Sequence, residues 1–272
     1  MKVLLSINPK HYDVKPKKII DIIKKYDIDK NIEGFEVWVD VNRTSQKYVS
    51  ELAKLCKENN YILNLHSPIF EGFDKADKFL KIANELAKLL ERKINIVMHL
   101  LNDSEEHLKI ADKYLNYLLI AIKEKNYDLL ISIENLTQKE INKQQLIPFF
   151  EKYPELKFTY DMGHEYVDRI NLYELSETLI ERLNNFHLHS FEGDLDHYPI
   201  TQKDINFLEK FLKIIKASNF SKTVVLEYST DYIEGKDMEE KIINYVKSTN
   251  IFPKLIKEIE ERNEGNEKYK RK

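Results

Sequence analysis

Histidines and carboxylates recur in this sequence at the ends of short apolar runs. Imidazole and carboxylate both bind divalent metal ions, and several buried carboxylates are costly unless a cation accompanies them. If the ends of these runs meet in space, the residues predict a metal site. Six of the eight histidines and three carboxylates hold such positions: His66, His99, His164, His187, His189, His197, Glu134, Asp161 and Glu227.

The apolar runs have the composition of buried β-strands. Between them lie stretches rich in lysine and glutamate, such as FLKIANELAKLLERK, with apolar residues at the i, i+3, i+4 and i+7 spacing of an amphipathic helix. Alternation of eight strands with helices predicts the α/β class and a closed parallel (β/α)₈ barrel, in which the carboxyl ends of all strands converge at one mouth. The eight runs begin at Val3, Phe35, Tyr61, Ile94, Leu129, Leu156, Asn184 and Thr223.

Composition narrows the classes of protein to consider. The chain has 272 residues and a formal net charge of -3, which argues against a general nucleic-acid coat protein. Its single cysteine, Cys56, excludes a disulfide framework and is expected to be structural. No apolar run reaches the roughly 20 residues of a membrane span, and MKVLLSINPK is too short for a signal peptide. We expect a cytoplasmic protein with no membrane contact.

The sequence shows no linker and no shift in composition, so a single domain is expected over residues 1–264. The segments KDMEEKIINYVKS and PKLIKEIEERNEG predict extra C-terminal helices, and residues 265–272 are expected to form a flexible tail. No glycine-rich phosphate-binding motif follows any strand, which leaves a nucleotide-binding function without support. A homodimer is possible, because barrel helices often pair.

Five short motifs also resemble those of a known superfamily. They are IEN at 133–135, YDMGH at 160–164, FHLH at 186–189, DHYPI at 196–200 and VVLE at 224–227. In this order and spacing they resemble the xylose isomerase-like TIM barrels, which include the endonuclease IV family and the tagatose/psicose 3-epimerase families. The resemblance extends over nearly the whole chain.

The epimerase pattern implies one divalent metal ion, such as manganese, cobalt or magnesium. Its four ligands would be Glu134, Asp161, His187 and Glu227. The two glutamates would also act as catalytic base and acid, moving a proton through an enediolate-like intermediate. His164 would contact a substrate oxygen. Because this set is complete, a metal-dependent isomerase or epimerase acting on a small sugar or sugar phosphate is the first function expected.

The endonuclease IV pattern is the alternative, and it implies up to three zinc ions and abasic DNA as substrate. It adds His66 and His99, with Glu134 bridging two ions, and takes His164 and His197 as ligands of the third ion.

Three features of the sequence differ from the endonuclease IV pattern and argue against the nuclease interpretation. The pattern expects an aspartate two residues before His197, where Leu195 stands between Asp194 and Asp196, so either aspartate could be the ligand. Thr201 replaces an expected glycine. The loops after the first two strands are also short and offer few arginine or aromatic side chains to a duplex.

The sequence does not determine the function class or the roles of several residues near the strand ends. A non-catalytic metal-binding barrel is a third possibility, because a fold alone does not fix a function. Glu36 faces either the mouth or a helix, His189 has no assigned role, and Trp38 is expected to be a packing residue.

Overall fold

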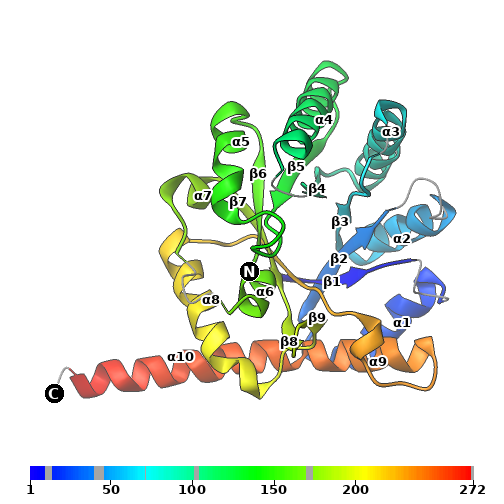
Figure 1. The fold of residues 1–272 in the computed structure, drawn as a ribbon. Helices are drawn as coiled ribbons and strands as arrows, with labels where there is room; N and C mark the ends of the chain where they lie inside the picture. The colour runs from blue at the N-terminus through cyan, green and yellow to red at the C-terminus, as the bar shows by residue number, and fades with distance from the viewer. Residues whose placement is uncertain (10–13, 40–45, 71, 101–103, 170–173, 271–272) are drawn as a thin grey trace.

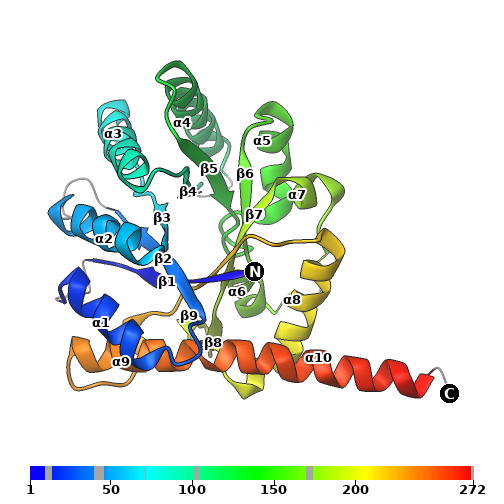
Figure 2. The same ribbon diagram turned by 180° about the vertical axis from the view of Figure 1, so that it is seen from behind.

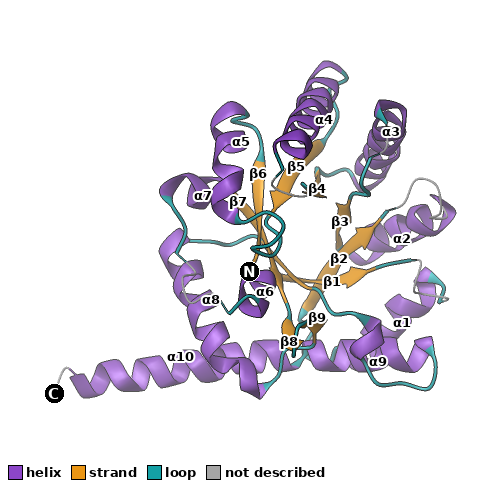
Figure 3. Cartoon of the chain, viewed as in Figure 1, coloured by secondary structure: helices purple, strands orange, loops and turns teal. Residues whose placement is uncertain are grey.

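A closed barrel of eight parallel strands forms the centre of the molecule (Figures 1 and 3). The computed structural model describes residues 1–9, 14–39, 46–70, 72–100, 104–169 and 174–270. Around the barrel the order is β1-β10-β7-β6-β5-β4-β3-β2. All eight strands predicted from the sequence are therefore present, and each lies beside the barrel strand that precedes or follows it in the chain. The strands are β1 (Lys2–Ile7), β2 (Ile32–Trp38), β3 (Ile62–His66), β4 (Ile94–His99), β5 (Leu129–Glu134), β6 (Lys157–Asp161), β7 (Leu183–Leu188) and β10 (Thr223–Leu226).

Helices surround the strands on the outside, as both faces of the ribbon show (Figure 2). Amphipathic patterning directs their apolar stripes onto the barrel. Local signals fix several ends: Ser104 caps α4 by accepting a hydrogen bond from the backbone N–H of His107. The helices are α1 (Pro16–Tyr26), α2 (Gln46–Asn59), α3 (Phe73–Leu90), α4 (Glu105–Glu124), α5 (Ile147–Lys152), α6 (Met162–Val167), α7 (Glu177–Arg182), α8 (Ile205–Ser218), α9 (Met238–Thr249) and α10 (Ile251–Lys270).

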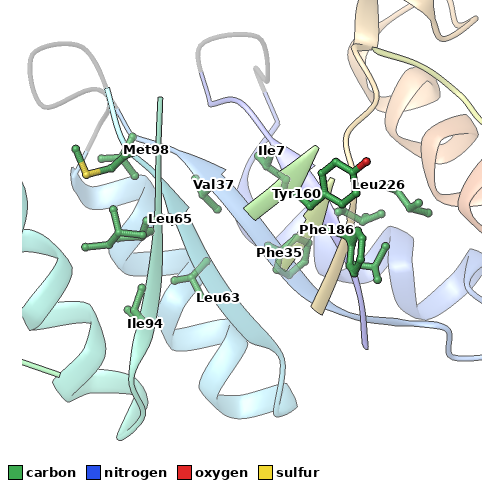
Figure 4. Packing of buried hydrophobic residues seen from close by; sticks show 14 of the residues in the cluster. Ile7, Phe35, Val37, Leu63, Leu65, Ile94, Met98, Tyr160, Phe186 and Leu226 are labelled. Carbon is green, nitrogen blue, oxygen red and sulfur yellow. The ribbon is translucent and has the colours of Figure 1, made fainter. Parts of the chain in front are cut away.

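The hydrophobic core occupies the barrel interior and the layer between strands and helices. Strand side chains are buried on both faces, which explains why the runs are continuously apolar rather than alternating. Figure 4 shows part of this packing, with Phe35, Tyr160 and Phe186 gathered in one region. The rings of Tyr160 and Phe186 lie 5.8 Å apart. Cys56 is fully buried, as expected of a structural residue.

Two additions complete the fold. After β7 the chain forms a short antiparallel hairpin of β8 (Ser190–Glu192) and β9 (Leu195–Tyr198). After β10, α9 packs against α1, and α10 packs against α8 and α9 before projecting past the barrel (Figure 1). The expected C-terminal helices are therefore present. The tail at 265–272, of which 271–272 lie outside the described residues, stays a prediction.

Among the described residues, no helix combines the length and the hydropathy that crossing a membrane would require.

Candidate metal centre

Parallel strands bring the chemistry-bearing residues to one end of the barrel. His66, His99, Glu134 and Asp161 are the last residues of β3 to β6, and Glu227 directly follows β10. The strand register places His99 beside Glu134, and Asp161 beside His187 near the end of β7. Because all strands run the same way, this convergence follows from the barrel itself. Among the described residues these side chains form three clusters, and within each cluster the possible ligand atoms lie within 4.8 Å of one another.

The first cluster consists of His66, His99 and Glu134. The Nε2 atoms of His66 and His99 lie 3.3 and 3.1 Å from Oε2 of Glu134. On the other side of His66, the indole of Trp38 stacks at 3.5 Å between ring centroids, with an angle of 9° between the ring planes. Trp38 thus fixes the ring of one candidate ligand and is more than a packing residue.

The second cluster consists of Glu134, Asp161, His187 and Glu227. Nδ1 of His187 lies 3.0 Å from Oε1 of Glu134 and 2.8 Å from Oε2 of Glu227. Its other ring nitrogen, Nε2, lies 2.8 Å from Oε1 of Glu36. Glu36 therefore faces the barrel interior beneath the mouth, where Oε2 also accepts a hydrogen bond from Asn185. All four members are buried, so three carboxylates share a space with little access to water.

The third cluster consists of Asp161, His164 and His189. Asp161 is the N-cap of α6, accepts a hydrogen bond from the backbone N–H of His164 at 2.9 Å, and so places that imidazole beside its own carboxylate. Nε2 of His164 lies 3.4 Å from Oδ2 of Asp161, and Nε2 of His189 lies 3.4 Å from Oδ1. The sequence motifs alone assign no role to His189.

The β8–β9 hairpin brings two further candidate residues close to the third cluster. The His197 ring lies 4.3 Å from the His189 ring, and His197 has a left-handed backbone with φ of 61°. Oδ2 of Asp196 lies 3.6 Å from Nδ1 of His164. The side chain of Asp194 is exposed. Of the two aspartates that flank Leu195, Asp196 is the one that reaches the histidines.

Electrostatics in the second cluster favour a positive charge. Burial alone would raise the pKa of Glu134, yet the imidazoles of His187 and His99 hold it well below its ordinary value. Burial alone would lower the pKa of His187, yet the carboxylates of Glu134 and Glu36 raise it well above its ordinary value. A positive charge among these buried carboxylates, from a proton on His187 or from a cation, would offset their mutual repulsion.

The spacing of the donor atoms also fits divalent cations. Ligand atoms that surround an ion tetrahedrally at about 2.0–2.1 Å are about 3.3 Å from one another. Several donor pairs have separations of 3.0–3.4 Å. Among the described residues, His66 Nε2, His189 Nε2 and Asp161 Oδ2 are buried and form no hydrogen bond. Buried polar atoms without a partner are costly, so the residues present fit a group of metal ions.

A cavity of about 150 Å³ opens beside the second cluster. Trp38 lines it and donates a hydrogen bond from Nε1 to Oε1 of Glu227 at 3.2 Å. Burial and the neighbouring His189 lower the pKa of His197 to about 4, so a neutral imidazole forms part of the wall. Sequence reasoning missed Trp38, although it ends β2 as the histidines end β3 and β4. Residues 10–13 and 40–45, from the loops judged poor in DNA-binding side chains, lie outside the described residues.

A buried ion pair supports the segment that carries the third cluster. Lys143 Nζ lies 2.8 Å from Oε2 of Glu165 on α6, and the hydroxyl of Tyr160 donates to the same oxygen. Lys143 is only 2% exposed. These contacts tie α6 to β6 and to the chain before α5, so the positions of Asp161 and His164 depend on them.

Several solved structures have a similar architecture. D-psicose 3-epimerase from Clostridium cellulolyticum H10, solved with D-tagatose, has a TM-score of 0.62 and 12% identity, covering 94% of this chain and 99% of that one. The AsfvAP:AG structure has a TM-score of 0.60 and 11% identity, with coverage of 94% and 99%. SacUVDE has a TM-score of 0.52 and 12% identity, with coverage of 93% and 99%. At this identity the likeness shows the fold alone.

No curated protein sequence matches the chain. The xylose isomerase-like TIM barrel family, in contrast, matches residues 28–248, which include every member of the three clusters. On the strength of that match, the chain belongs to the xylose isomerase-like TIM barrel family.

Proposed function

We propose that the protein is a metal-dependent hydrolase of phosphoesters, with abasic DNA as the first substrate to test. One observation carries this proposal: the two oxygens of Glu134 face different clusters. Oε2 lies within 3.3 Å of two imidazoles of the first cluster, and Oε1 lies 3.0 Å from His187 of the second. A single-metal isomerase has no use for His66 and His99, whereas a shared carboxylate suits two adjacent cations.

The chain's own residues would prepare such a reaction. Adjacent divalent cations supply charge to both the attacking and the leaving oxygen of a phosphoester. Glu134 would fix the spacing of the two cation positions, since its carboxylate is buried and contacted from both sides. Trp38 holds Glu227 at the cavity wall through its Nε1–H and keeps water away from one face of His66. The neutral His197 imidazole can accept or donate a hydrogen bond to a substrate in the cavity.

The test uses chain stripped of metal and reloaded with Zn²⁺ or Mn²⁺. We expect the reloaded protein to cleave a duplex containing one abasic site, or the small diester bis(p-nitrophenyl) phosphate, and the stripped protein to cleave neither. Glu134→Gln should lower the rate at least about 100-fold and reduce the metal content. The control Glu192→Gln changes an exposed carboxylate of β8 and should stay within about twofold of the unaltered chain. Failure of the loaded chain to cleave either substrate would contradict the proposal.

A metal-dependent sugar isomerase or epimerase is the second candidate. The size and lining of the cavity favour it, because about 150 Å³ beside Trp38 and Glu227 suits a small polyol better than a large substrate. Glu134 and Glu227, which would act as base and acid, both lie close to Nδ1 of His187, at 3.0 Å and 2.8 Å, so the two carboxylates border the same candidate metal position.

Hydrogen exchange distinguishes this candidate from the hydrolase. Ketohexoses incubated with the metal-loaded chain in D₂O should gain deuterium next to the carbonyl, as measured by NMR. Glu227→Gln should abolish the exchange while leaving metal bound at the first cluster. Exchange that survives this substitution would exclude Glu227 as acid or base.

A further inference from the structure

We infer that Asn135 is a positioning residue of the metal centre, because its side-chain amide holds the backbone of Asp161 next to that of Glu134. This inference rests on the proposed metal centre, of which Glu134 and Asp161 are two candidate ligands. Asn135 is the last residue of the IEN motif, in which the glutamate has an expected ligand role and the asparagine has none. The side chain of Asn135 is fully buried.

The amide of Asn135 makes two hydrogen bonds to the same residue. Nδ2 donates to the backbone carbonyl of Asp161 at 2.8 Å, and Oδ1 accepts from the backbone N–H of Asp161 at 3.0 Å. These partners allow only one orientation of the amide, because a peptide N–H can only donate and a carbonyl oxygen can only accept. An ionised aspartate of the same shape would offer acceptors alone, and a leucine would offer neither group.

The two hydrogen bonds continue the pairing of β5 with β6 beyond the last backbone pair. That pairing ends at Glu134 and Thr159. Asp161 lies two residues further along β6, and on its other side it pairs with His187 of β7. The amide of Asn135, which has the same donor and acceptor as a peptide group, takes the place of the β5 backbone at this point. Without it, two backbone groups of the fully buried Asp161 would have no partner on this side.

The side chain of Asp161 is held by a separate contact. Its Oδ1 accepts a hydrogen bond from the backbone N–H of His164 at the start of α6, at 2.9 Å. Its Oδ2 is buried, has no hydrogen bond within the described chain and lies 3.9 Å from Nδ1 of His187. With the backbone and one oxygen held, the other oxygen has a fixed position in the second cluster. Ligand atoms that are already in place bind more tightly, because less ordering is required on binding.

The hydrogen bonds of Asn135 also oppose a repulsion within the second cluster. Possible ligand oxygens of Glu134 and Asp161 lie within 4.8 Å of each other. Two buried negative charges at this distance repel, which favours separation of the ends of β5 and β6. Because Asn135 directly follows Glu134, its two hydrogen bonds to Asp161 resist that separation. Asn135 therefore acts through the two carboxylates and not by contact with a cation.

A purely structural role is the alternative, and Asn95 offers a matched comparison. Asn95 is also a buried asparagine, and its Oδ1 accepts a hydrogen bond from the hydroxyl of Ser132 at 2.6 Å. It is the second residue of β4, four residues before His99, and so lies toward the opposite end of the barrel from the mouth. Loss of either amide should destabilise the fold. Only the loss of Asn135 should alter metal binding.

The experiment compares Asn135→Ala with Asn95→Ala in the full chain, with Zn²⁺ and Co²⁺ alone as probes. We expect N135A to bind at least one Zn²⁺ about 10-fold more weakly than the parent, measured by competition with a chelator, and N95A to stay within about twofold. At saturating Co²⁺, the visible absorption of N135A should differ from that of the parent in position and intensity, because these bands depend on coordination geometry. The absorption of N95A should match that of the parent.

Folding is measured separately on the metal-free proteins. Urea denaturation should show that both alanine variants are less stable than the parent. Where N135A does not fold, Asn135→Thr keeps a hydroxyl that can serve one of the two Asp161 groups, and it should still bind Zn²⁺ more weakly than N95A does. Zn²⁺ affinity and a Co²⁺ spectrum equal to those of the parent would overturn the inference and leave the proposed hydrolase standing. A parent chain that binds neither ion would overturn both.

Discussion

The imidazole of His189 lies directly against the backbone of Gly163, two residues after Asp161 in the chain. A β-carbon added at Gly163 would be 2.5 Å from Cε1 of that ring and closer still to Nε2. Glycine at this position thus lets the first turn of α6 approach β7 closely enough for His164 and His189 to face the same carboxylate. The small residue in the DMGH motif is explained by packing against a second histidine.

The variant Gly163→Ala should displace the His189 ring without removing its imidazole. Because that ring contacts Asp161, we expect weaker metal binding at Asp161 and unchanged binding at His66 and His99, as measured by elemental analysis. Gly72→Ala is the control, because a β-carbon there meets only the flexible carboxylate of Asp74. Full metal content in G163A would show that the ring position does not matter for binding.

The variant Trp38→Phe should separate stacking from hydrogen bonding at the cavity wall. Phenylalanine keeps an aromatic ring against His66 but cannot donate to Oε1 of Glu227. A hydrogen bond to a charged group stabilises its acceptor by more than about 1.4 kcal/mol, which corresponds to a factor of about ten. If Glu227 needs this hydrogen bond to keep its position during the reaction, turnover should fall by about 10-fold while the metal content stays unchanged. Steady-state kinetics on whichever substrate is found active measures this. Turnover equal to that of the parent would return Trp38 to a packing role.

The variant Lys143→Met should make folding stability depend on pH. Burial raises the pKa of Glu165 above 4.5 even with Lys143 and Tyr160 opposing the shift, and loss of the lysine raises it further. Above pH 4.5 the folded chain then holds a proton that the unfolded chain has released, so stability falls as pH rises toward the folded pKa. We expect the free energy of unfolding to fall by about 3 kcal/mol at pH 8 and by less as the pH approaches 5. Urea denaturation at several pH values measures this.

The matched control for Lys143→Met is Lys152→Met. Lys152 pairs with Asp112 at 2.7 Å, and both side chains are accessible to water. Its loss should change the unfolding midpoint far less than the loss of Lys143, because solvent screens an exposed ion pair. Equal losses of stability from the two substitutions would show that burial of the Lys143–Glu165 pair does not determine its contribution to stability.

The variant Tyr245→Phe tests how α9 supports the mouth. The Tyr245 hydroxyl donates to the carbonyl of Leu226 and accepts from the backbone N–H groups of Ser6 and Tyr228, so it joins the ends of β1 and β10 on either side of Glu227. We expect a loss of about 1–3 kcal/mol in unfolding free energy, measured by urea denaturation, and weaker metal binding at the second cluster. Stability and metal affinity equal to those of the parent would exclude a supporting role for this hydroxyl.

The sequence by itself determined the strands and the residues at their ends. Continuous apolar runs and helical periodicity are local signals, and eight repeats of them leave few architectures other than a barrel. Because strand ends in such a barrel converge, the gathering of His66, His99, Glu134, Asp161, His187 and Glu227 followed from position alone.

Only the tertiary structure decided which way the remaining residues face. Both faces of these strands are buried, so alternation could not show that Glu36 points to His187, or that Trp38 donates to Glu227. The position of His189 depends on the close approach of α6 to β7, a contact between segments that are distant in sequence. The geometry of the β8–β9 hairpin likewise brings Asp196, and not Asp194, close to the imidazole of His164. The local sequence pattern therefore determines which residues stand at the end of each strand, and packing between distant segments determines which of their side chains come into contact.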